Sequence, residues 1–131
     1  MALPGFDMKI LVVDDFPTMR KIIRQVLSQI GYTDVIEASD GLLALDVLKN
    51  NKDVQFIISD WNMPKMTGVE LLKAIRANPT HRDVPFLMVT AEADKENIVE
   101  AVKNGANNYI VKPFNAATLK DKIEKVFSNR R

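Results

Sequence analysis

The chain has 131 residues, a net charge of +1 and an apolar fraction of 47%. The length fits one domain, and the apolar content is typical of a globular protein with a buried core. The nearly balanced charge gives no sign of binding to nucleic acid, to acidic polymers or to a membrane surface. The chain contains no cysteine, which excludes disulfides, thiolate metal sites and cysteine nucleophiles and fits a cytoplasmic protein.

We expect residues 1–7 to be a flexible lead-in and residues 8–131 to form a single domain in which strands and helices alternate. The lead-in lacks the basic start and apolar core of a secretion signal. No apolar run approaches the ~20 residues of a membrane span. Residues 10–13 predict the first strand, and the next segment has the i, i+3, i+4, i+7 spacing of a helix with one buried stripe. Pro17 suits the first turn of this helix and Gly31 suits the left-handed residue at its end. The predicted stripe comprises Met19, Ile22, Ile23, Val26, Leu27 and Ile30.

The alternation continues to the end of the chain. Further strands are predicted at residues 35–38, 56–59, 86–89 and 109–111, and helices at about 41–49, 67–78, 95–104 and from 115 onward. In the second helix we expect Leu42, Leu45 and Leu48 to face inward, and the third helix opens with a capping box from Thr67 to Glu70. Most of the strands are nearly all apolar, as are strands covered by helices on both faces. The sequence therefore predicts a three-layer, doubly wound α/β domain with a five-stranded parallel sheet.

Chemically reactive side chains follow four of these strands. Asp14 and Asp15 follow the first strand, Asp60 the third, Thr90 the fourth and Lys112 the fifth. In an open parallel sheet the carboxyl ends of all strands lie at one edge, where ligands bind. We therefore expect three carboxylates, a hydroxyl and an ammonium to meet in one shallow pocket. Such a set can hold a hard divalent cation and take up a phosphoryl group.

A carboxylate at a strand end is often only a cap or a solvated turn residue, and for Asp14 alone we favour that interpretation. The interpretation changes when three such residues occur together, as Asp14, Asp15 and Asp60 do. Crowded like charges cost free energy unless a cation compensates them. Mg²⁺ does so, and it keeps water ligands that a phosphoryl oxygen can replace. At the centre of this group, Asp60 can attack phosphorus as a carboxylate nucleophile.

Lys112 and Thr90 also have plain interpretations, as a solvated lysine and a β-branched strand residue. However, the bond between Lys112 and Pro113 can be cis, and we expect a cis bond that turns the ammonium into the pocket. The Thr90 hydroxyl, at the end of an apolar strand, is expected to face the pocket and to donate to a phosphoryl oxygen. An inward shift of Thr90 leaves space for the ring of Tyr109, which makes a two-state element that one charged modification can bias. We interpret His81, alone in a polar loop, as solvated.

Four ordered blocks, at residues 12–15, 59–64, 89–92 and 109–114, resemble the receiver domains of two-component response regulators. The resemblance extends over residues 8–127 and is strongest to the CheY-like single-domain regulators of chemotaxis. It implies a flavodoxin-like sheet with the strand order 2-1-3-4-5.

The resemblance also implies roles for the residues in these blocks. Asp60 is the phosphoacceptor, and Asp14, Asp15 and Asp60 hold Mg²⁺ together with the backbone carbonyl of Asn62. Thr90 and Lys112 contact the phosphoryl oxygens, and Tyr109 is an aromatic switch. The implied partner face consists of Lys95, Ile98, Val102, Ala106, Tyr109, Val111 and Lys122.

The function implied is that of a phosphorylation-activated switch, not of an enzyme with an external substrate. The protein would take a phosphoryl group from a histidine kinase, catalyse this transfer and its own dephosphorylation, and bind the flagellar motor switch as a monomer when phosphorylated. A phosphatase is a further candidate partner, and neither nucleic acid nor a membrane is expected. Pro17 replaces the small polar residue often found after the acidic pair, and Asn62 and Glu92 occupy positions that affect the lifetime of the phosphoryl group.

The sequence leaves three alternatives open. A receiver in another phosphorelay would share the same site. A Mg²⁺-dependent phosphatase would need a cap and an acid–base aspartate beside the nucleophile, and Trp61 and Asn62 do not supply one. A flavodoxin-like cofactor carrier would need a phosphate loop after the first strand, where Asp14 and Asp15 would repel a phosphate.

Overall fold

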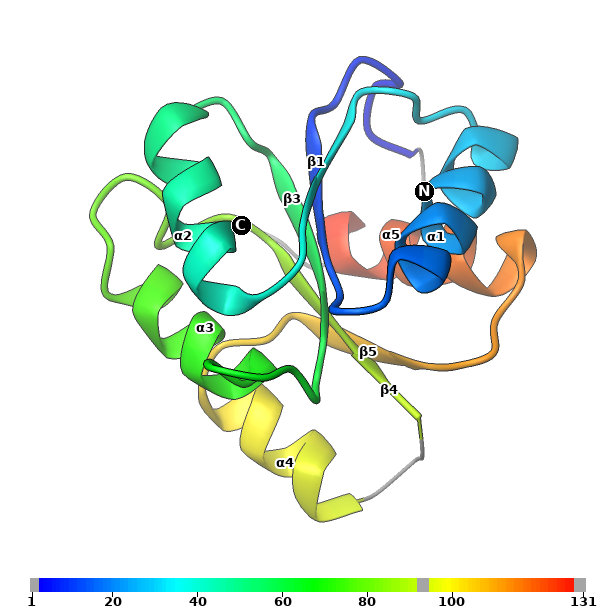
Figure 1. Cartoon of the computed structure of the whole chain (residues 1–131). Coiled ribbons are helices and arrows are strands. Elements are labelled where there is room, and N and C mark those ends of the chain that lie inside the picture. Colours follow the sequence, from blue (N-terminus) through cyan, green and yellow to red (C-terminus); the bar gives the residue numbers. More distant parts are fainter. Residues whose placement is uncertain (1–2, 92–94, 129–131) are drawn as a thin grey trace.

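A computed structural model describes residues 3–91 and 95–128, and in this part of the chain five strands alternate with five helices (Figure 1). The strands are β1 (Ile10–Val13), β2 (Val35–Ala38), β3 (Phe56–Asp60), β4 (Phe86–Thr90) and β5 (Asn108–Val111). The helices are α1 (Pro17–Ile30), α2 (Gly41–Asn50), α3 (Gly68–Arg76), α4 (Lys95–Lys103) and α5 (Ala116–Ser128).

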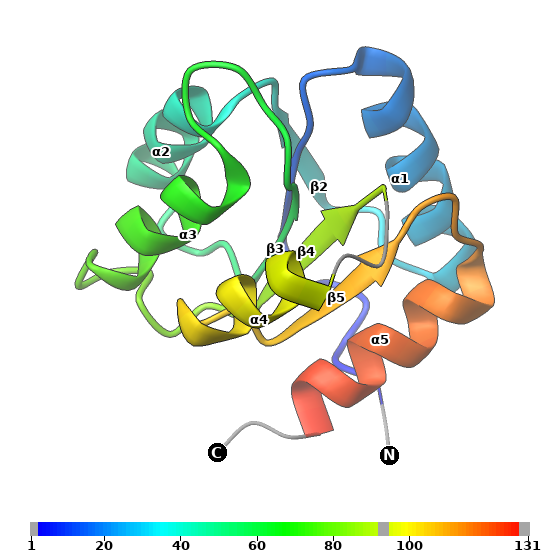
Figure 2. The same cartoon turned by 90° about the horizontal axis from the view of Figure 1, so that it is seen from below.

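The strands form one parallel sheet in the order β2-β1-β3-β4-β5, which confirms the predicted class and strand order. Helices α1 and α5 cover one face of the sheet, and α2, α3 and α4 cover the other (Figures 1 and 2). In the central strands Val13 pairs with Ser59 and Asp60 pairs with Val89, so these strands end nearly level.

Each face of the sheet contributes to a separate core. Along β1, Ile10 and Val12 pack into the core under α1 and α5, whereas Leu11 and Val13 pack into the core under α2 and α3. All four residues are fully buried. An apolar residue at every position of a strand is what burial on both faces requires. The sheet is therefore packed on both faces beneath the residues that follow each strand.

The helix ends follow the predicted signals. Pro17 begins α1, and Gly31, with φ of 130°, ends it by donating its N–H to the carbonyl of Leu27. The capping box of α3 is present, because the Thr67 hydroxyl accepts from the Glu70 N–H at 3.2 Å and the Glu70 carboxylate accepts from the Thr67 N–H at 2.9 Å.

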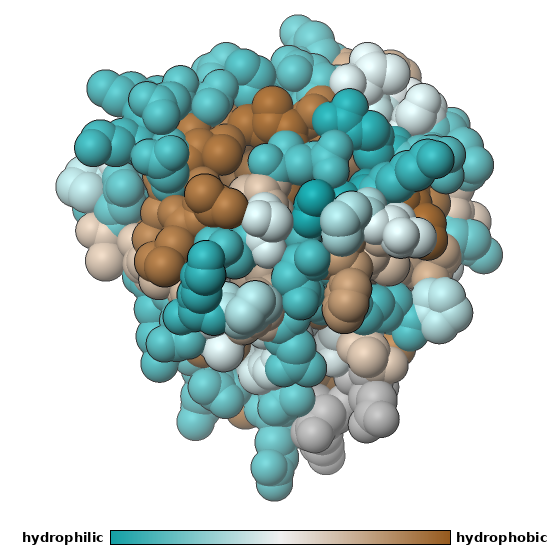
Figure 3. All heavy atoms as spheres, in the orientation of Figure 1, coloured by the Kyte–Doolittle hydropathy of each residue, from teal (hydrophilic) through white to brown (hydrophobic). Residues whose placement is uncertain are grey.

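Two predicted core positions are wrong. Ile22 of α1 and Leu42 of α2 are 42% and 51% exposed. In α2 the side toward the sheet consists of Gly41, Ala44 and Leu48, so small residues pack close to the strands and the leucine pattern alone misplaces the buried side. Apolar side chains accordingly gather on the surface over α2 (Figure 3), where Leu42 is exposed.

The N-terminal segment contacts the end of α1. The Tyr32 hydroxyl donates to the carbonyl of Pro4 at 2.7 Å, and the rings of Phe6 and Tyr32 pack edge to face with centroids 5.2 Å apart. Burial raises the pKa of the Tyr32 phenol to about 12. The flexibility expected for residues 1–7 stays a prediction. No helix in the described ranges is long and apolar enough to cross a membrane.

Gly68, at the start of α3, lies directly against the end of β3. A Cβ at this position would overlap the main-chain oxygen of Asp60 and would approach the Met88 sulfur to 2.9 Å. Because the strand end would have to move, we expect Gly68→Ala to lower the free energy of unfolding by about 1–3 kcal/mol, the usual cost of overpacking. Urea unfolding measures this change.

Gly5→Ala is the control for this substitution, since its Cβ would meet only the end of the Asp7 side chain. Equal unfolding midpoints for Gly68→Ala and the unmodified protein would contradict the close approach of α3 to β3.

Candidate functional site

The sheet brings the predicted residues to one edge. Asp14 and Asp15 directly follow β1, Asp60 ends β3, Thr90 ends β4 and Lys112 directly follows β5. Carboxylate oxygens of the three aspartates lie within 4.8 Å of one another. The parallel arrangement thus assembles residues from the two halves of the chain into one acidic site.

The site is largely shielded from water. Asp14 is fully buried, and Asp60 and Thr90 are 4% and 6% exposed. One carboxylate oxygen of Asp14, Oδ1, accepts from the N–H of Phe16 at 2.9 Å. The other, Oδ2, and Oδ1 of Asp15 are buried without a hydrogen-bond partner in the described part of the chain. Buried oxygens of this kind are costly unless something else binds them.

Lys112 supplies the positive charge of the site. Its Nζ donates to Oδ1 of Asp60 at 3.2 Å and lies 3.9 Å from Oδ2 of Asp14, beyond hydrogen-bond distance. The peptide bond between Lys112 and Pro113 is cis, which confirms the prediction. The ammonium thus faces two of the three carboxylates.

Burial raises the pKa of two of the acidic residues, Asp14 and Asp60. Burial raises the pKa of Asp60, the nearby charge of Asp14 raises it further, and the charge and hydrogen bond of Lys112 oppose both effects. Burial likewise raises the pKa of Asp14, against the hydrogen bond from the Phe16 N–H and the charge of Lys112. The charged form of both carboxylates is therefore disfavoured, because their surroundings compensate its charge only partly.

The donor set fits a hard divalent cation. Asp14 and Asp15 each offer a buried oxygen without a hydrogen-bond partner, and Asp60 offers a third carboxylate at the same point. Mg²⁺ prefers such oxygen ligands and retains water for the remaining positions. Asn62 lies in the loop after β3 with an exposed side chain, and the role of its carbonyl as a ligand stays a prediction. Glu92 lies outside the described residues.

A second set of residues lies beside Thr90. A cavity of about 10 Å³ is lined by residues that include Thr90, Trp61 and Tyr109. The Tyr109 ring is half-buried, and Nζ of Lys122 lies 4.5 Å from its centroid, in a cation–π arrangement. Burial lowers the pKa of Lys122. Thr90 and Tyr109 are thus close neighbours, as the predicted switch requires.

The predicted partner face is only partly exposed. Val102 is 55% exposed, whereas Ala106 is 7% exposed and contributes little surface. Ile98 and Val111 are half-buried. The side chain of Lys95 lies outside the described residues.

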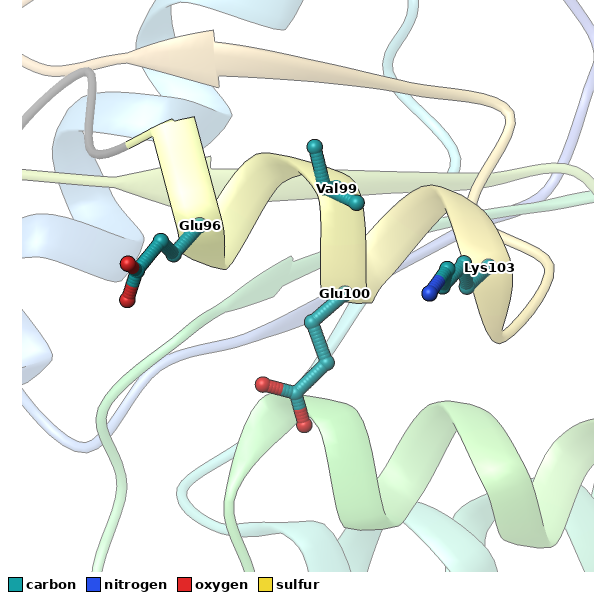
Figure 4. Close-up of a pocket in the computed structure, with 4 residues that line it drawn as sticks. All are labelled: Glu96, Val99, Glu100 and Lys103. Atoms are coloured by element: carbon teal, nitrogen blue, oxygen red, sulfur yellow. The ribbon is translucent and has the colours of Figure 1, made fainter.

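Another side of α4 carries a hollow of about 580 Å³ that the sequence analysis did not identify. The residues that line it are Glu96, Val99, Glu100 and Lys103, with Glu100 directed toward α3 (Figure 4). Their spacing of three and four residues is a helical stripe, so this side of the helix was readable from the sequence.

His81 is not solvated, which makes that prediction wrong. It is 1% exposed, and its Nε2 lies 3.4 Å from the carbonyl of Asn51 at the end of α2. The loop between α3 and β4 folds the ring inward, although the sequence around His81 is polar.

The chain is similar to known proteins over most of its length. The family model described as "Response regulator receiver domain" matches residues 10–124. The chain is 54% identical to "Chemotaxis protein CheY-3" of Vibrio cholerae over 126 aligned residues, and this alignment covers 96% of each of the two chains. It is 52% identical over 120 residues to "Chemotaxis protein CheY" of Pseudomonas aeruginosa, which covers 92% of this chain and 96% of that protein.

Solved structures show the same fold. Vibrio cholerae CheY4 superposes with a TM-score of 0.84 at 38% identity, covering 92% of this chain and 98% of that one. The receiver domain of the sensor histidine kinase PA1611 from Pseudomonas aeruginosa, solved with a magnesium ion in its active-site cleft, gives a TM-score of 0.83 at 28% identity, covering 94% and 99%. The chain therefore belongs to the response regulator receiver domain family.

Proposed function

We propose that this protein is a chemotaxis response regulator that accepts a phosphoryl group on Asp60 from a histidine kinase and then binds the flagellar motor switch. The observation that carries the proposal is the position of Asp60. It is nearly buried at the end of β3, bonded to Lys112 on one side, and beside carboxylates with two unpartnered oxygens on the other. The names of its relatives favour chemotaxis over another phosphorelay.

In this proposal Asp60 is the nucleophile. A carboxylate oxygen of Asp60 forms a bond to phosphorus, and the bond from phosphorus to the donor's imidazole nitrogen breaks, with the electron pair leaving on that nitrogen. The charge and hydrogen bond of Lys112 oppose the rise in the Asp60 pKa and so favour the anionic form that attacks. Lys112 then faces the new phosphoryl oxygens, as does the hydroxyl of Thr90.

Mg²⁺ would be held by Asp14, Asp15 and Asp60, with the carbonyl of Asn62 as a further ligand. When bound, it supplies positive charge to the phosphoryl oxygens. Asp14 and Asp60 are buried, so little bulk water reaches the two carboxylates themselves. Loss of the phosphoryl group would occur at the same residues, and a phosphatase is a candidate partner for that step.

The output in this proposal runs from Thr90 to Tyr109. A phosphoryl group on Asp60 attracts the Thr90 hydroxyl, and the Tyr109 ring then turns toward the space beside it. The surface around Tyr109 and Val102 changes with the ring and binds the motor switch. The protein acts as a cytoplasmic monomer that moves between kinase and motor.

Our first prediction here is that Asp60 is the only phosphorylated residue. Acetyl phosphate with Mg²⁺ should add one acid-stable, base-labile phosphate, measured by intact mass, and Asp60→Asn should abolish it. The control is Asp46→Asn, which removes an exposed carboxylate on α2, and this variant should be labelled normally. Undiminished labelling of Asp60→Asn would refute the assignment.

A second prediction concerns stability without Mg²⁺. Burial raises the pKa of Asp14 in the folded state above its value in the unfolded chain. Below about pH 4 the Asp14 carboxyl is protonated in both states and costs no stability. As the pH rises through the folded-state pKa, the folded protein loses stability, because the buried carboxyl has to ionise. Asp14→Asn should therefore raise the free energy of unfolding at pH 7, by about 0.5–3 kcal/mol for contacting charges. The gain should shrink toward pH 4 and when saturating Mg²⁺ is added.

Urea unfolding at pH 7 and at pH 4, with and without Mg²⁺, measures this dependence. Asp46→Asn should change stability little at either pH, because that carboxylate is exposed. A loss of stability in Mg²⁺-free Asp14→Asn at pH 7 would be inconsistent with crowding of uncompensated charge.

A third prediction concerns the output face. Coupling between two sites is usually ~1–3 kcal/mol, so a beryllofluoride mimic on Asp60 should raise affinity for a motor-switch peptide roughly 5- to 150-fold. Thr90→Ala should remove this increment and keep basal binding, whereas Thr33→Ala, exposed in the loop before β2, should keep both. Fluorescence titration of the peptide measures these affinities, and equal affinities with and without the mimic would argue against a phosphorylation-gated face.

A further inference from the structure

Asp14 has four polar atoms, of which three are held by neighbours. Its N–H donates to the carbonyl of Ala38 at 3.2 Å, and its Oδ1 accepts from the N–H of Phe16 at 2.9 Å. Its main-chain oxygen accepts from Nη1 of Arg20 at 2.7 Å. Only Oδ2 has no hydrogen-bond partner among the described residues. The contact with Arg20 is the one contact of the three that comes from a side chain.

The bond from Arg20 also determines how Asp15 is presented. The carbonyl of Asp14 and the nitrogen of Asp15 belong to one planar peptide unit, so a bond that fixes the carbonyl fixes the plane from which Asp15 departs. Asp15 carries the other buried oxygen without a hydrogen-bond partner. The guanidinium of Arg20 therefore holds the peptide unit that joins the two carboxylate residues.

The start of α1 offers little other support for this turn. Phe16 occupies the N-cap and makes no side-chain capping bond, and Pro17 in the first turn has no N–H. The first turn contains no acidic residue. Arg20 lies one turn further along, where its own N–H donates to the Phe16 carbonyl at 3.1 Å and its side chain reaches back to Asp14.

Arg20 is itself held in place. Its Nε lies 3.0 Å from Oε1 of Glu37 on β2, and Oε2 of the same carboxylate lies 3.1 Å from Nε of Arg24. Arg24 in turn donates from Nη2 to the carbonyl of Val35 at 2.7 Å. The side chain of Arg20 is 16% exposed, against 46% for Arg24. Charge-assisted bonds of this kind fix geometry well, because the guanidinium is a planar fork.

We propose that Arg20 is a positioning residue for the metal site, because it orients the Asp14–Asp15 main chain so that both free carboxylate oxygens point at one cation. The inference rests on the Mg²⁺ site of the proposed function. It makes a distinctive prediction, since the charge of Arg20 by itself disfavours a nearby cation. Removing the charge alone would tighten Mg²⁺ binding, whereas losing the orientation would weaken it.

The test is the Mg²⁺ affinity of two matched variants, Arg20→Met and Arg24→Met. Each loses one positive charge and one bond to Glu37, but only Arg20 contacts Asp14. Partners that orient metal ligands typically contribute 10- to 100-fold to affinity, so we expect the Kd of Arg20→Met to rise about tenfold. We expect the Kd of Arg24→Met to stay within about twofold of the unmodified protein. Emission of Trp61, the single tryptophan, follows the titration, and calorimetry gives the same Kd independently of the fluorophore.

Arg20→Lys covers the case in which Arg20→Met does not fold. Lysine keeps the charge but cannot bridge the Asp14 carbonyl and Glu37 as a planar fork, so its Kd should also rise, by less. Thermal unfolding without Mg²⁺ separates stability from affinity in every variant. An unchanged or lower Kd in the folded Arg20 variants would overturn the inference. Absence of saturable binding in the unmodified protein would instead overturn the proposed metal site itself.

Discussion

The structure depends most on the crowding of three carboxylates at one edge of the sheet. Asp14 and Asp60 are almost completely removed from water, so their charges are neither hydrated nor screened by solvent. The three carboxylates outnumber the ammonium of Lys112 that faces two of them, so their ionised forms carry negative charge that a divalent cation could compensate. The acidic cluster could therefore hold a metal ion.

Much of this site could be read from the sequence because a parallel sheet sends the carboxyl end of every strand to the same edge. An apolar run followed by Asp14, by Asp60 or by Lys112 was enough to predict which side chains would meet, without knowledge of any distance. The class of fold and the strand order followed in the same way from alternation and from the family resemblance. The alternation of strands and helices and the polar residues at strand ends depend on the direction of the backbone. They do not depend on particular side-chain contacts.

The parts that the sequence did not reveal are contacts across space. Ala44 and not Leu42 faces the sheet, because close packing of α2 favours a small residue at that point. His81 is buried although its neighbours in the chain are polar, since the loop folds back against the end of α2. Arg20 lies within a helix whose spacing predicts only a solvated side, and its bond to the Asp14 carbonyl depends on how that helix is placed on β1. A linear pattern carries no signal for such contacts.

The spread of the site along the sequence has a consequence for how the protein folds. Because the acidic pair comes from β1 and the ammonium from the chain after β5, the site spans almost the whole sequence and forms only when the last strand has paired. Such long-range pairing is the slow part of folding for a parallel sheet. A nascent, truncated or partly unfolded chain in which β5 is unpaired would thus have the carboxylates but not the ammonium in place. In the function that we propose, such an incomplete molecule would lack the lysine that favours the anionic form of Asp60, and it would therefore not signal.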